Sequence, residues 1–113
     1  MKYIMKRKYA LALIGILFLS LLATEAVASD IEEVVGKKLI PTYTYARIYK
    51  NGSDLKIHSD RPECQYSVTL CLGGEYEKPW PIWIKDYAGK SHEVPLDVGD
   101  MVVYHGTELE HWR

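Results

Sequence analysis

The chain has 113 residues and a formal net charge of −1, which leaves room for one small domain. Residues 30–113 hold 10 basic and 14 acidic side chains, so bulk charge does not favour nucleic acid as a partner. The sequence contains no Cys-x-x-Cys pair, internal repeat or Gly-rich phosphate loop. These absences argue against zinc-finger, repeat and P-loop proteins.

The N-terminal segment has the pattern of a secretory signal. Residues 1–8 are rich in basic side chains, residues 9–23 are apolar except for Ser20, and small residues follow at Ala26-Val27-Ala28. We therefore expect a signal-like or membrane-anchor segment over residues 1–29, followed by a domain over residues 30–113. An apolar run of about fifteen residues is short for a transmembrane span, so any membrane contact would be made through this segment if it is uncleaved.

The alternative for this region is a helix over Leu17–Val35 that packs on a sheet. Gly36 would then cap its C-terminus, because glycine readily adopts the left-handed conformation that ends many helices.

The next elements read as a strand, a turn and a second strand. Tyrosines alternate through Tyr43–Tyr49, a Gly-containing turn covers Lys50–Ser53, and a second extended stretch covers Asp54–Asp60. The alternating tyrosines predict either a packed aromatic ladder or one wall of a ligand site.

The remaining elements are also predicted to be strands. They cover Tyr66–Leu72, Trp80–Ile84 and Met101–Tyr104, the last of them after a turn at Gly99-Asp100. The pattern predicts an all-β fold.

His58, Asp60 and His111 are the candidate metal ligands. Residues i and i+2 of a strand point to one face, so His58 and Asp60 could offer an imidazole and a carboxylate to one ion. His111 would complete the set. Two histidines and one carboxylate form the facial triad of non-haem Fe(II) oxygenases. The alternative is a polar strand end at which Asp60 pairs with Arg61 in solvent.

The order of these parts resembles that of the 2-oxoglutarate- and Fe(II)-dependent dioxygenases, nearest to the prolyl 4-hydroxylase-like branch. The resemblance covers roughly Leu39–Arg113 and rests on the tyrosine strand, the Gly turn, His-x-Asp, the apolar strand, the Gly-Asp turn and the distal histidine. It implies a double-stranded β-helix, a jelly-roll of two short sheets. It also implies that His58, Asp60 and His111 bind iron and that Tyr49 contacts 2-oxoglutarate.

The implied reaction is hydroxylation of a peptide, amino acid or small metabolite with O2 and 2-oxoglutarate, with ascorbate as a candidate further cofactor. The resemblance assigns no side chain a direct catalytic role beyond binding metal and cosubstrate. Members of the family place an Arg or Lys about ten residues after the distal histidine, where it pairs with the far carboxylate of 2-oxoglutarate. This chain has Arg113 two residues after His111, so we expect a C-terminally incomplete oxygenase domain of doubtful activity.

Two other functions remain open from the sequence. One is a non-catalytic exported β-sandwich binding module in which the three residues never converge. The other is a degenerate oxygenase that binds metal without turnover. The location is also open, because the N-terminus suggests export while bacterial relatives in this family usually work in the cytoplasm.

Overall fold

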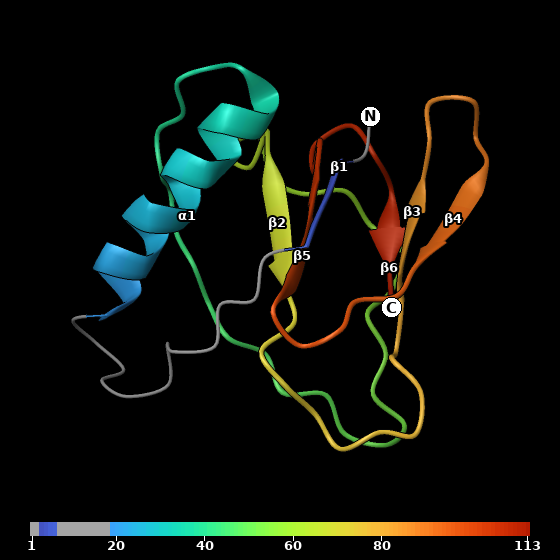
Figure 1. The fold of residues 1–113 in the computed structure, drawn as a ribbon. Coiled ribbons are helices and arrows are strands. Elements are labelled where there is room, and N and C mark those ends of the chain that lie inside the picture. Colours follow the sequence, from blue (N-terminus) through green and yellow to red (C-terminus); the bar gives the residue numbers. More distant parts are fainter. Residues whose placement is uncertain (1–2, 7–18) are drawn as a thin grey trace. The chain divides into compact units, whose positions relative to one another are not determined.

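The computed structural model describes residues 3–6 and 19–113, and these fall into two compact units. The first unit joins Met1–Lys8 to Tyr49–Arg113 and contains the strands of the described residues (Figure 1). The second unit covers Tyr9–Ile48 and contains the helix.

Two three-stranded antiparallel sheets form the first unit (Figure 1). In sheet A the order is β1-β5-β2, and in sheet B it is β4-β3-β6. The strands of sheet A are β1 (Tyr3–Lys6), β2 (Ser67–Leu70) and β5 (Asp100–Tyr104). Those of sheet B are β3 (Ile82–Lys85), β4 (Ser91–Val94) and β6 (His111–Trp112). The described chain is therefore mostly β with little helix, as expected for an all-β protein.

The two sheets share one hydrophobic core. Val102 and Tyr104 come from β5 of sheet A, and Ile82 and Ile84 come from β3 of sheet B. Val94, Leu96 and Leu109 complete the cluster. Alternation of side chains along β3 explains this arrangement, because Ile82 and Ile84 are buried while the intervening Trp83 is only partly buried.

The predicted strand over Tyr43–Tyr49 is wrong, because this stretch has no regular secondary structure. Tyr43, Tyr45 and Ile48 are all exposed, so the alternation does not produce a buried face that would hold a strand in place. The rings of Tyr43 and Tyr45 stack on each other at 6.2 Å between centroids, and Arg47 lies over the Tyr45 ring.

Helix α1 (Leu19–Val35) ends as the helical alternative predicted. Gly36 has a φ of 70°, and its N–H donates to the carbonyl oxygen of Glu32 at 2.9 Å, which closes the last turn. The described part of the chain contains no helix long and apolar enough to cross a membrane.

About half of the signal-like segment expected over residues 1–29 lies outside the described residues, since residues 1–2 and 7–18 are not among them. The part that is described places residues 3–6 in β1, which pairs with β5, and begins α1 at Leu19.

Candidate metal centre

The segment that carries His58 pairs with the C-terminal strand through two reciprocal backbone contacts. Leu55 and Arg113 exchange N–H···O bonds of 2.7 and 3.1 Å, and His58 and His111 exchange bonds of 3.1 and 2.8 Å. The paired residues Leu55 and His58 are three positions apart in their segment. Their partners Arg113 and His111 are only two positions apart. Lys56 and Ile57 together therefore oppose Trp112, which is the geometry of a β-bulge.

This bulge places the two histidines directly opposite each other. Without it, Ile57 would pair with His111, and His58 would point to the other face of the ladder. As it is, the rings of His58 and His111 lie 4.4 Å apart between centroids. The Asp54–Asp60 segment is thus not the regular strand that the sequence predicted, and its irregularity brings His58 to the site.

Asp60 joins the two histidines. Its backbone N–H donates to the carbonyl oxygen of Gly106 at 2.8 Å, which fixes the chain just after His58. Carboxylate oxygen Oδ1 lies 3.6 Å from Nε2 of His58 and 3.4 Å from Nε2 of His111. The three candidate ligands predicted from the sequence are therefore brought together, with one ligand atom from each lying within 4.8 Å of the others.

Both imidazoles are oriented by their second ring nitrogen. Nδ1 of His58 lies 2.7 Å from the carbonyl oxygen of Lys56, and Nδ1 of His111 lies 2.9 Å from that of Leu109. A carbonyl oxygen can only accept, so in the neutral rings each Nδ1 carries the proton and each Nε2 keeps a lone pair. Histidines commonly ligate metals in this arrangement, in which the ring nitrogen that does not bind the ion donates to a backbone carbonyl oxygen.

His111 is the most deeply buried member, at 2% side-chain exposure, against 23% for Asp60 and 37% for His58. Burial lowers its pKa, and the hydrogen bond to Leu109 and the charge of Asp60 oppose that shift only in part. The neutral form that a metal requires is therefore favoured. Solvent reaches the cluster from the side of His58 and Asp60.

The packing around His111 restricts its ring further. The Tyr104 ring lies 4.7 Å away in an edge-on contact, and Leu109, two residues before His111, is buried in the core. On β3 the residue opposite His111 is the buried Ile84. An imidazole in this position has its Nε2 directed to Asp60 with little freedom to turn away.

The chemistry of the donor set suits a divalent metal ion. Ligand bonds near 2 Å to a common ion require donor atoms about 3–4 Å apart. The two distances from Asp60 satisfy this condition, and all three donor atoms lie within 4.8 Å of one another. Two neutral imidazoles and one carboxylate suit Fe(II) when three further positions stay free.

Sequence reasoning missed two residues that support Asp60. Ser67, the first residue of β2, donates its hydroxyl to Oδ2 of Asp60 at 2.5 Å. Gly106 lies so close to both groups that a Cβ built on it would overlap Oδ2 of Asp60 and Oγ of Ser67. The sequence shows Gly106 two residues after the apolar strand of Met101–Tyr104. Its contact with Asp60 and Ser67 is visible only in the folded structure.

Tyr49 lies in an aromatic cluster with Trp80 and Arg113. Its ring meets that of Trp80 edge-on at 4.8 Å, and the Arg113 guanidinium lies 5.3 Å from the Tyr49 centroid. Arg113 also donates Nε and Nη2 to the carbonyl oxygen of Trp80. The role of Tyr49 in binding 2-oxoglutarate stays a prediction, and Arg113 is held by contacts of its own.

The other two histidines have other partners. Nε2 of His92 lies 2.6 Å from Oδ2 of Asp86, and the His105 ring packs on Tyr66 at 4.5 Å between centroids. Among the described residues, the group capable of holding a metal is therefore the one formed by His58, Asp60 and His111.

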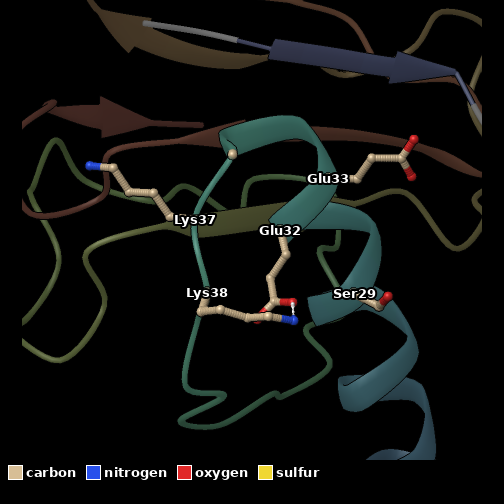
Figure 2. Close-up of a pocket in the computed structure, with 6 residues that line it drawn as sticks. Ser29, Glu32, Glu33, Lys37 and Lys38 are labelled. Carbon is tan, nitrogen blue, oxygen red and sulfur yellow. Dashed lines mark hydrogen bonds and ion pairs between the residues drawn. The ribbon is translucent and has the colours of Figure 1, made fainter.

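A hollow at the end of α1 is part of the helix cap (Figure 2). Glu32 accepts from Nζ of Lys38 at 3.0 Å and from the backbone N–H of Leu39 at 2.7 Å. The Leu39 N–H first, and then Lys38, lower the pKa of the Glu32 carboxyl. Figure 2 shows Glu33 and Lys37 pointing away from this pair, so the hollow has no convergent set of polar groups.

Comparison with known proteins finds no matching family, no curated relative and no similar solved structure.

Proposed function

We propose that this chain carries the metal centre of an Fe(II)- and 2-oxoglutarate-dependent dioxygenase with a double-stranded β-helix fold. The convergence of His58, Asp60 and His111 is the observation that carries the proposal. Two antiparallel sheets with a common core, one of which bears His111, support the proposed fold.

The residues of this chain would hold and orient the ion. His58 and His111 would bind through Nε2, because each Nδ1 is directed at a backbone carbonyl oxygen. Asp60 would bind through Oδ1, which faces both rings. With all three donors on one side, the opposite side of the ion stays available for a cosubstrate.

A bound Fe(II) would supply oxidative chemistry in which 2-oxoglutarate and O2 yield succinate, CO2 and one oxygen atom for a substrate C–H bond. The partly exposed side of the cluster, at His58 and Asp60, is where a peptide, amino acid or small metabolite would approach.

Anaerobic titration of the full chain with Fe(II), followed by 2-oxoglutarate, tests this function. We expect Fe(II) to bind and the cosubstrate to produce a metal-to-ligand charge-transfer band in the visible spectrum. Asp60→Ala should abolish the band and weaken Fe(II) binding by more than the roughly 10- to 100-fold typical of outer-shell changes.

Two variants serve as controls for the titration. Asp54→Ala removes an exposed carboxylate paired with Lys56, and His92→Ala removes a histidine paired with Asp86. Both should bind Fe(II) like the parent chain. Failure of the parent chain to bind Fe(II) would overturn the proposal and favour a non-catalytic binding module. Fe(II) binding without the band would favour a metal-binding protein without turnover.

A further inference from the structure

The two oxygens of the Asp60 carboxylate have different partners. Oδ1 faces the two imidazoles, whereas Oδ2 lies 2.5 Å from Oγ of Ser67. The Ser67 hydroxyl has one proton, and its other neighbour, the carbonyl oxygen of Cys64, is farther away at 3.4 Å. Because an ionised carboxylate can only accept, Ser67 donates to Oδ2.

Ser67 and a second group that touches the cluster come from one rung of sheet A. Ser67 on β2 pairs with Tyr104 on β5, and the Tyr104 ring packs edge-on against the imidazole of His111. This cross-strand pair therefore contacts two of the three candidate ligands. Gly106, two residues after Tyr104, leaves the space in which the Asp60 carboxylate and the Ser67 hydroxyl meet.

We propose that Ser67 is a positioning residue that makes Asp60 a one-oxygen ligand. Turning the carboxylate so that both oxygens reached an ion would break the Ser67 hydrogen bond. Keeping Oδ2 on Ser67 limits the protein to three donor atoms. A six-coordinate ion then retains three positions, of which a keto acid needs two and O2 needs one. This inference rests on the proposed metal centre and adds the residue that limits how many donor atoms the protein gives to the ion.

Ser67→Ala tests the assignment with Co(II) or Mn(II) as the probe, so that the readout does not depend on activity. We expect affinity for the ion to fall about 10- to 100-fold, the range found when an outer-shell partner of a ligand is removed. Infrared difference spectra should also change. The separation of the carboxylate stretching bands on metal binding should be wide in the parent chain, as for one-oxygen binding, and narrow in the variant, as for two-oxygen binding.

Ser59→Ala is the matched control, because it removes the same atom from an exposed serine next to Asp60. Its affinity and its carboxylate bands should match those of the parent chain. Thermal unfolding of metal-free Ser67→Ala measures any general loss of fold separately.

The outcomes that contradict the two proposals are distinguishable. A parent chain that binds no metal would overturn the proposed function and this inference together. A parent chain that binds metal, with unchanged affinity and bands in folded Ser67→Ala, would overturn the role of Ser67 alone. That role would also be overturned if Ser59→Ala behaved like Ser67→Ala.

Discussion

Gly106 is the residue on which the spacing of the cluster depends most directly. A methyl group at this position would overlap both Oδ2 of Asp60 and Oγ of Ser67, so both side chains or the Gly106 backbone must shift. Gly106→Ala should therefore displace the carboxylate and weaken Co(II) binding at least about tenfold, the lower end for loss of an outer-shell contact. Equilibrium titration of Co(II) absorption measures this change.

The same substitution should destabilise the metal-free protein by about 1–3 kcal/mol, the usual cost of overpacking. Urea unfolding in the presence of a chelator measures that cost. Unchanged Co(II) affinity in a folded Gly106→Ala protein would show that Asp60 does not need this position.

His58, Asp60 and His111 were chosen as candidate ligands from their residue types together with the order of the flanking elements and the family resemblance, because a His-x-Asp triplet alone is weak evidence. Residue types did not identify Ser67 or Gly106. A serine at the start of a strand and a glycine after one occur for many reasons. What distinguishes these two is contact with Asp60, which their positions in the chain do not reveal.

At the scale of elements, the bulge opposite Trp112 decides which side chain faces His111. The spacing of His58 and Asp60 suggested a regular strand, and a regular strand continuing from the Leu55–Arg113 pair would have placed Ile57 there. Bulges depend on how two segments pair, so the sequence of either segment gives little sign of one. The sequence predicted the candidate ligands, but not the local structure that brings His58 opposite His111.

The β3–β4 hairpin supplies a pH-dependent prediction. Oδ1 of Asp86 accepts from the N–H groups of Ala88 and Lys90, while Oδ2 lies 2.6 Å from Nε2 of His92. These contacts, first that of His92 and then that of Lys90, lower the pKa of Asp86 below its ordinary value of 3.8.

The lowered pKa of Asp86 determines how the stability of the fold changes with pH. The unfolded chain binds the proton more tightly than the folded hairpin does, so the stabilisation is present above pH 3.8 and is lost as the pH falls through the folded pKa. Asp86→Asn keeps an oxygen acceptor but removes the charge. It should be less stable than the parent chain at neutral pH, with a difference that shrinks below about pH 4.

Urea midpoints measured across this pH range test the hairpin prediction, with Asp54→Asn as a control in an exposed surface pair. A constant difference between Asp86→Asn and the parent chain at all pH values would contradict it.

At the scale of the whole molecule, the metal would join parts of the chain that are far apart in sequence. His58 and Asp60 precede β2, whereas His111 begins β6. An unfolded chain does not hold these three groups together, so an ion that binds the native cluster should stabilise the fold. At a free concentration 100 times the Kd, the gain is about 2.7 kcal/mol.

Thermal unfolding with increasing Mn(II) or Co(II) should therefore show a midpoint that rises with metal concentration and falls again on adding a chelator. Asp60→Ala should remove the dependence, while His92→Ala should retain it. A midpoint that does not respond to metal in the parent chain would mean that the native state holds no specific ion.

The sequence by itself determined the residue types of the cluster, the alternating apolar residues of β2 and the apolar runs of β3 and β5, and it offered as one alternative the helix that ends at Gly36. Each of these depends on local properties: donor chemistry, side-chain periodicity and backbone freedom. Only the tertiary structure decided that Tyr43–Tyr49 forms no strand, that Lys56 and Ile57 bulge, and that Ser67 and Gly106 meet at Asp60. These features arise from pairing and burial between segments distant in the chain, which a local pattern of residues does not encode.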